Sequence, residues 1–259
     1  MTKRVLITVK APPTPSKNYQ ETNCCAGIDL DSGKWIRLYP IPFRLLGSDQ
    51  QFPKYSIIKV KCQRPIRDKR IESYKADQDS IEILSHLDTK NRWSERKKII
   101  LPTVSSSFCK ILEDIKIKKS LGVFKPTDIS FYFKKTVSKS KVEHQMVYNQ
   151  HRLFDRKLKP IEQIPFAFYY KFKCFNQPNC LGHDLKIHDW EITQSFRSWR
   201  HRYKDQEELL EKIKERWLDM CSSKKDAYFF VGNMWKHPKR FMVLGVFYPQ
   251  KTTEPTAMG

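Results

Sequence analysis

The chain has 259 residues, 39% of them hydrophobic, which is enough apolar material for the core of one large domain or two small ones. Its 49 Lys and Arg residues outnumber its 28 Asp and Glu residues and give a formal net charge of +21 at pH 7. No run of about eighteen apolar residues occurs, which excludes a membrane-spanning helix, and the positive excess favours a polyanionic partner such as nucleic acid.

The start of the chain and its cysteines both favour the cytoplasm. Residues 1–10 lack the long apolar region and the small-residue cleavage site of a secretory signal. The seven cysteines, an odd number spread along the chain, are typical of reduced thiols rather than of a disulfide framework. We therefore expect a cytoplasmic protein with no membrane partner.

Short β segments dominate the first part of the chain. Residues 5–9 form an apolar, β-branched run, and residues 22–30 and 35–39 flank a tight Asp-Ser-Gly turn, as in a hairpin. Residues 55–62 alternate between apolar and polar side chains, as a further strand does. Four such segments within about sixty-five residues predict a small β-barrel of the OB-like kind.

Helical patterns become frequent beyond residue 66. We expect an α+β protein in which an OB-like small β-barrel is joined by a mixed or antiparallel sheet and packed helices. Helices are predicted over residues 91–100, 105–119, 190–203 and 206–220, and further strands over 128–134, 164–175, 226–232 and 241–248. The expected portions are an OB-like barrel at 1–66, a mixed linker and helical portion at 67–163, a strand-knuckle-helix-strand portion packed on the barrel at 164–249, and a disordered tail at 250–259.

Four side chains that commonly bind metals lie within fifteen residues around a turn-forming Asn-Gln-Pro-Asn sequence: Cys174, Cys180, His183 and His188. Thiolates and neutral imidazoles suit a tetrahedral cation, zinc above all. The interval between the two cysteines is wider than in standard zinc sites, whereas that between Cys180 and His183 is regular. The motif therefore indicates either a structural zinc site, with Cys62 or Cys221 as replacement ligands, or a metal-free hairpin leading into a helix.

The second strand of the predicted hairpin carries a candidate nucleic-acid-binding face. Alternation places Trp35, Arg37 and Tyr39 on one face of the strand and Ile36 and Leu38 on the other. OB-like barrels bind single strands by stacking bases on aromatic side chains beside a basic groove. Alternatively, the aromatic side chains complete a core or an interface between domains. The cations expected to contribute to this face are Arg44, Lys59 and Lys61.

Two further segments combine basic and aromatic side chains. One is the end of the helix predicted at 190–203, where guanidinium groups suit bidentate phosphate contacts and a solvated helix face is the alternative. The other is the loop between the last two strands, which is expected to be exposed. The side chains expected to contact nucleic acid there are Arg197 and Arg200 in the helix and Trp235, Lys236, Lys239 and Arg240 in the loop.

Catalytic motifs are scarce. The chain contains no Gly-rich phosphate loop, no Gly-x-Ser-x-Gly elbow and no His-Glu-x-x-His zinc helix. Asp189 and Glu191 suit Mg²⁺ binding or acid-base catalysis, but Asp189 at the start of a helix is more simply an N-cap. Glu95, in a charged segment, is a weak candidate for a nuclease carboxylate. A metal-dependent nuclease or other nucleic-acid-processing enzyme is therefore the alternative, and a non-enzyme is the first expectation.

Two resemblances extend this picture. Residues 24–40 resemble the opening hairpin of a bacterial family with paired OB-like barrels, in which a Cys-(Ile/Val)-Ala-Gly strand leads into Gly-x-Trp-Ile-Arg. Residues 35–44, with Asp-Trp-Glu at 189–191 and Gly-x-Phe-Tyr-Pro at 245–249, resemble a largely uncharacterised prokaryotic family. The second resemblance implies an accessory protein of mobile or defence islands and brings no established activity.

Charge, aromatic side chains and resemblance together predict a nucleic-acid-binding accessory protein, a non-catalytic subunit of a prokaryotic defence or mobile-element machine. Its expected partners are DNA or RNA, single strands being favoured, and other protein subunits. A protein-interaction scaffold whose aromatic side chains bury against a partner chain is the remaining alternative.

Overall fold

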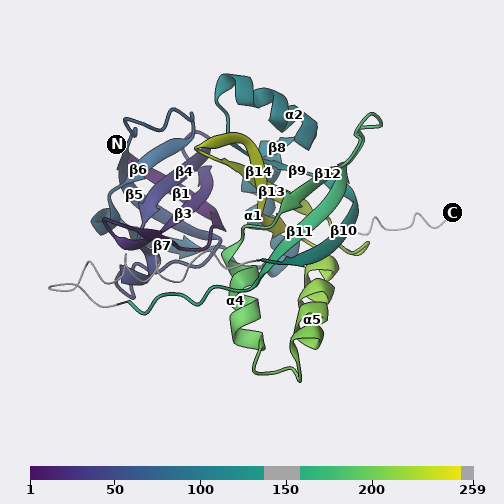
Figure 1. Cartoon of the computed structure of the whole chain (residues 1–259). Helices are drawn as coiled ribbons and strands as arrows, with labels where there is room; N and C mark the ends of the chain where they lie inside the picture. Colours follow the sequence, from purple (N-terminus) through teal and green to yellow (C-terminus); the bar gives the residue numbers. More distant parts are fainter. Residues whose placement is uncertain (137–157, 252–259) are drawn as a thin grey trace.

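The computed structural model describes residues 1–136 and 158–251. A β-barrel built from the amino-terminal part of the chain lies beside a second portion, in which two small sheets are covered by helices (Figure 1). The expected disordered tail at 250–259 falls almost entirely outside the described residues.

The barrel closes on itself through its first strand. Its strands are β1 (Thr2–Lys10), β3 (Gln20–Asp29), β4 (Trp35–Ile41), β5 (Ser56–Gln63) and β6 (Ser73–Ala76). β1 pairs antiparallel with both β3 and β5, β3 pairs with β4, and β4 pairs parallel with β6, which returns to β5. This Greek-key order is that of an OB-like barrel, so the predicted α+β fold class is confirmed. Two strands extend the sheet, β2 (Thr14–Ser16) beside β3 and β7 (Glu82–His86) beside β5.

Strand alternation fills the barrel. Ile58 and Val60 on β5 and Ile36 and Leu38 on β4 are buried in one core, while the side chains between them face outward. β3 passes so close to β1 that a Cβ atom on Gly27 would lie 1.9 Å from the carbonyl oxygen of Leu6. The barrel includes β6 and therefore continues beyond residue 66.

The second portion contains two antiparallel hairpins of aromatic strands. The first sheet has the order β14-β13-β9-β8, with β8 parallel to β9, and the second has the order β10-β11-β12. Phenylalanine and tyrosine side chains of both sheets share one core with the helices. The bounds are β8 (Val104–Ser105), β9 (Leu121–Phe124), β10 (Pro126–Lys135), β11 (Phe166–Cys174), β12 (His183–Lys186), β13 (Tyr228–Met234) and β14 (His237–Phe247).

The helices lie near their predicted positions. They are α1 (Lys90–Ile100), α2 (Phe108–Glu113), α4 (Trp190–Trp199) and α5 (Gln206–Asp219), with short 3-10 turns η1 (Phe43–Leu45), η2 (Gln78–Ser80), η3 (Leu101–Thr103) and η4 (Asp114–Ile117). Asp205 caps α5 by accepting a hydrogen bond from the backbone of Glu208. The helix predicted over 105–119 begins later, at Phe108, because Ser107 caps α2 by accepting a hydrogen bond from the backbone of Lys110, and after Glu113 it continues as the 3-10 turn η4. Within the described ranges, no helix is both long enough and apolar enough to cross a membrane.

A buried ion pair joins the two portions. Nζ of Lys54, two residues before β5, lies 2.8 and 2.7 Å from the two carboxylate oxygens of Asp189. Asp189 also caps α4 by accepting a hydrogen bond from the backbone of Glu191. Two carboxylates raise the pKa of Lys54 although burial alone would lower it. Trp190, which follows Asp189, lies in the core of the barrel. Its ring packs edge-on against that of Phe43, with 5.3 Å between the ring centroids.

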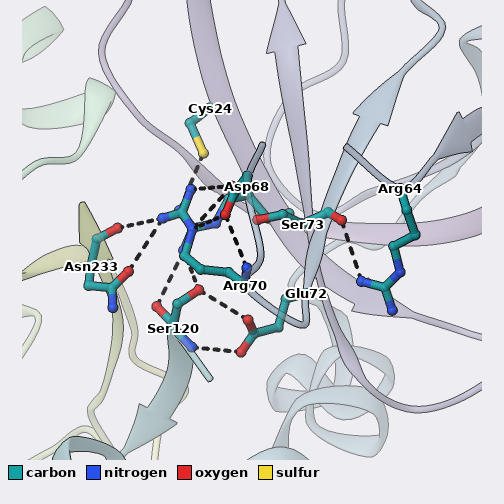
Figure 2. Close-up of polar contacts among 9 residues, drawn as sticks. Cys24, Arg64, Asp68, Arg70, Glu72, Ser73, Ser120 and Asn233 are labelled. Atoms are coloured by element: carbon teal, nitrogen blue, oxygen red, sulfur yellow. Dashed lines mark hydrogen bonds and ion pairs between the residues drawn. The ribbon is translucent and has the colours of Figure 1, made fainter. Parts of the chain in front are cut away.

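A second polar junction joins β4 and the residue before β6 to the residue before β9. Glu72 accepts hydrogen bonds from the backbone of Ser120 at 2.8 Å and from its hydroxyl at 3.0 Å (Figure 2). Nη2 of Arg37 donates to the hydroxyl of Ser120 at 3.0 Å and to its carbonyl oxygen at 3.3 Å. These buried contacts bind β4 to the start of β9 and fix the second portion on the barrel.

Replacing Gly27 by Ala should destabilise the barrel, because the added Cβ atom collides with the backbone of β1. Overpacking costs about 1–3 kcal/mol, and urea denaturation should show a loss of unfolding free energy of that size. Gly33→Asn is the control, because no atom lies within 4 Å of its Cβ position and Asn tolerates its φ of +66°. A Gly27→Ala protein as stable as the wild type would contradict the close approach.

Lys54→Met should destabilise the protein by about 3–5 kcal/mol, because Asp189 then stays buried without its cation. The double variant Lys54→Met/Asp189→Asn should recover most of that loss, since Asn still caps a helix and carries no charge. Chemical denaturation of both proteins measures the difference. A double variant no more stable than Lys54→Met would refute the assigned role of the ion pair.

Candidate metal centre and interdomain pocket

Three cysteines and one histidine from separate elements converge at one edge of the second portion. Cys109 lies in the first turn of α2, Cys174 ends β11, Cys180 follows in the loop, and His183 begins β12. β12 pairs antiparallel with β11, and His183 lies opposite Phe172. This register brings the imidazole of His183 close to Cys174 at the end of β11. The four ligand atoms all lie within 4.8 Å of one another, so the group could hold a metal ion.

Four of the six distances between ligand atoms of this Cys3His group are close to those of a tetrahedral shell. Nε2 of His183 lies 3.3 Å from the sulfurs of Cys109 and Cys180 and 3.6 Å from that of Cys174, and the sulfurs of Cys109 and Cys174 are 3.9 Å apart. Metal-sulfur bonds of about 2.3 Å and metal-nitrogen bonds of about 2.0 Å at tetrahedral angles put such atoms roughly 3.5–3.8 Å apart. The residues present therefore fit a tetrahedral ion.

Backbone groups hold the sulfurs in place. The N–H of Phe108 donates to the sulfur of Cys174 at 3.3 Å, and the N–H of Cys174 donates to that of Cys180 at 3.4 Å. Burial raises the pKa of the Cys180 thiol, but hydrogen bonds from the backbone N–H groups of Cys174 and Gly182 and from the neighbouring thiols outweigh it and leave the pKa below its ordinary value. Burial also lowers the pKa of His183, which keeps its imidazole neutral, as a metal ligand must be.

Cys109 takes the position that the sequence assigned to His188. The backbone N–H of His188 donates to the carbonyl oxygen of Val243 at 2.7 Å, and its side chain lines the interdomain pocket, where burial lowers its pKa to about 4. Cys109 was missed because 65 residues separate it from Cys174. The signal that could have found it is Ser107, whose capping of α2 sets the position of the helix's first turn.

A pocket of about 760 Å³ lies where the barrel meets the second portion. Its walls come from β3 and β4, from the loop between β5 and β6, and from the hairpin of β13 and β14. Arg37 and Tyr39 of the predicted barrel face thereby share one cavity with Trp235 and Lys236 of the predicted loop. Two candidate segments almost 200 residues apart in the sequence form a single site.

Large apolar side chains stand exposed at the mouth of the pocket. Tyr39 is 48% exposed, Trp235 is 47% exposed and Ile66 is 89% exposed. Soluble proteins seldom leave such side chains together in water unless they bind something. The mouth therefore offers flat, uncovered surfaces beside its charged groups.

The pocket is strongly basic. Among the described residues that line it, Asp68 is the one carboxylate, and Arg70 neutralises it in an ion pair of 2.7 Å. Nη1 of Arg70 also donates to the backbone oxygen of Asn233 at 3.0 Å and so ties the loop between β5 and β6 to β13 (Figure 2). The cations of the lining are Arg37, Arg64, Arg67, Arg70, Lys75 and Lys236.

Trp35 does not reach this pocket. Its ring packs edge-on against Phe230 at 5.8 Å, within a core to which both portions contribute. The predicted alternation of β4 is present, but the second portion covers the part of the outer face that carries Trp35. The alternative role of this side chain, at an interface between domains, is the one that the structure has.

The other predicted cations are dispersed over the surface. Most are engaged locally: Arg44 pairs with Glu21, Lys59 with Glu82 at 3.0 Å, Arg200 with Glu162, and Arg197 donates to the backbone of Glu162 at 2.8 Å. The remaining three are Lys61, which lines a second pocket at the barrel end, and Lys239 and Arg240, which are exposed at the start of β14.

The candidate catalytic carboxylates do not form a site. Both oxygens of Asp189 are bound by Lys54, and one of them accepts from the backbone of Glu191, as the capping interpretation requires. Glu191 is exposed and lies 3.1 Å from the same lysine. Glu95 forms an exposed ion pair with Lys98 at 2.7 Å. None of the three belongs to the metal-ligand group found in the described part of the chain.

Two family models match the chain. One, described as a domain of unknown function (DUF8758), matches residues 1–102, and the other, described as a domain of unknown function (DUF8757), matches residues 104–258. The junction of the two matches falls between α1 and α2. Searches of curated proteins and of solved structures found no match.

Proposed function

The chain belongs to the family described as domain of unknown function (DUF8757), whose description assigns no activity, and from its site we propose that it binds single-stranded nucleic acid in the interdomain pocket. The role we propose is non-catalytic. Membership of a prokaryotic defence or mobile-element complex stays a prediction from sequence resemblance.

The observation that carries the proposal is the lining of the pocket. Six cations face one carboxylate that is already paired, and exposed Tyr39 and Trp235 stand at the mouth. Cations attract phosphates, and aromatic rings stack on bases. A net charge of +21 adds long-range attraction for any polyanion.

The position of the aromatic side chains favours a single strand over a duplex. Stacking on Tyr39 or Trp235 requires a base whose face is free, and in a duplex each base face is covered by its neighbours. The rings lie on the barrel strand β4 and in the turn after β13, so a strand that contacts both follows the seam between the two portions. DNA and RNA both present the required phosphates and bases.

The carboxylates support a binding function over a nuclease. Asp189 would have to release Lys54 and the start of α4 before it coordinated Mg²⁺. Glu95 and Glu191 lie on the surface in ion pairs with lysines. Each of the three has a structural role that needs no substrate.

The Cys3His group suits a structural zinc ion. Its four protein ligands complete a tetrahedral shell and leave no position for a substrate. Cys109, Cys174 and His183 come from α2, β11 and β12, so an ion bound there would join three elements that pack on one core.

Trp235→Ala should weaken binding of a labelled single strand by about 1–3 kcal/mol, the cost of losing one stacked base, while Trp235→Phe should retain most of the affinity. Fluorescence anisotropy with single- and double-stranded DNA and RNA measures this. Affinity that is absent even at low salt would refute the proposed function.

Lys236→Ala should reduce the slope of log affinity against log salt by about 1, because one phosphate contact is lost. Lys224→Ala is the matched control, since both lysines are exposed in turns, at opposite ends of β13, and Lys224 does not line the pocket. Equal changes of slope in the two variants would indicate binding by overall charge rather than in the pocket.

Metal analysis of the purified protein should find about one zinc per chain, and Cys109→Ser should remove it. His188→Gln and Cys221→Ser should both keep the metal, because neither side chain belongs to the group. Loss of zinc in His188→Gln with retention in Cys109→Ser would contradict the assigned ligands.

A further inference from the structure

The interdomain pocket has a floor that differs from its mouth. Its most buried lining residues are Val9, Ala11 and Leu244, which are 1%, 6% and 4% exposed, together with Arg37 at 5% and Asn233 at 4%. Arg64, Arg67 and Lys236, by contrast, are exposed. The floor is therefore mostly apolar, with one guanidinium and the amide of Asn233, which already bonds to Arg70 and Pro238, and the other positive charge is at the mouth.

Arg37 is incompletely satisfied at this floor. Its Nη2 donates to Ser120, but the acceptor described for Nη1 is the sulfur of Cys24 at 3.6 Å, and the described residues offer Nε no partner. Sulfur is a weak acceptor, and no described carboxylate forms an ion pair with this guanidinium. A buried donor without a good acceptor is costly, so a ligand that supplies an oxygen there gains affinity.

The two levels of the pocket match the two parts of a nucleotide. An apolar floor suits the faces of a base. A phosphate on that floor would lose its hydration and gain only one guanidinium, which already donates to Ser120. The exposed arginines and lysine at the mouth leave a phosphate both hydrated and neutralised. A volume of about 760 Å³ is in the range of pockets that enclose such a small group.

We propose that this pocket takes one unpaired base of the bound strand, with an exocyclic carbonyl oxygen of the base accepting a hydrogen bond from Nη1 of Arg37. The inference rests on the proposed function and adds a preference for certain bases. Guanine, cytosine, thymine and uracil carry such a carbonyl, whereas adenine offers only ring nitrogens as acceptors. The site is therefore expected to favour the four carbonyl-bearing bases over adenine at one position of the strand.

A contact with β13 holds the loop that carries Arg64 and Arg67 in place. Arg70 spans from Asp68 in that loop to Asn233 on β13 and closes one side of the pocket. Asn233 in turn donates to the backbone of Pro238 at 2.9 Å, which fixes the turn that bears Trp235. The residues proposed to contact the base and the phosphates are therefore held by one network of hydrogen bonds.

The test uses the whole chain and a short single strand in which every position is abasic, compared with strands that carry one central base. Competition anisotropy at low salt should show about tenfold tighter binding when guanine, cytosine or thymine is present. Adenine should give clearly less gain. Equal affinity of abasic and base-containing strands would overturn the inference, and an adenine strand as tight as the others would overturn the contact with Arg37.

Ala11→Leu provides a second test at the floor. The larger side chain narrows the floor, so the ratio of the affinities for base-containing and abasic strands should fall toward one, and thermal denaturation of the variant checks that it folds. A retained gain would show that bases stack outside the pocket and would overturn the inference. If neither abasic nor base-containing strands bind wild-type protein at low salt, the proposed function itself fails.

Discussion

The buried ion pair between Lys54 and Asp189 is the contact on which the arrangement of the two portions depends. One carboxylate both neutralises a lysine of the barrel and caps α4, so the helix can begin only where the barrel supplies the cation. Trp190 then occupies the barrel core. One charge pair thereby fixes the start of α4 against the barrel.

The interdomain pocket follows from that junction. Arg37, Ser120 and Glu72 bind the barrel to β9, and Arg70 and Asn233 bind the loop after β5 to β13. Between these contacts the two surfaces do not meet, and the space is lined by cations and flat rings. The polar network that holds the portions together therefore also sets the width of the site and the position of its aromatic side chains.

The Cys3His group performs a similar task at a different edge. Cys180 and His183 are neighbours in sequence, but Cys109 arrives on α2 and completes the shell from the other side. The rings of Phe108 and Phe172 flank that of His183, with ring centroids 4.8 and 5.4 Å away. A bound ion would strengthen packing that the aromatic core has already arranged.

The sequence alone determined four of the five barrel strands, with β6 missed, as well as the helices α4 and α5, the N-cap at Asp189 and three of the four candidate metal ligands, because each depends on spacing within a few residues. Alternation on β4 also predicted that Arg37 and Tyr39 face the same way. Only the tertiary structure decided that Trp35 is covered, that Cys109 replaces His188 and that Tyr39 shares a pocket with Trp235. These outcomes depend on which surfaces of the two portions meet, and no local pattern of side chains encodes the contact of segments that are 65 or more residues apart.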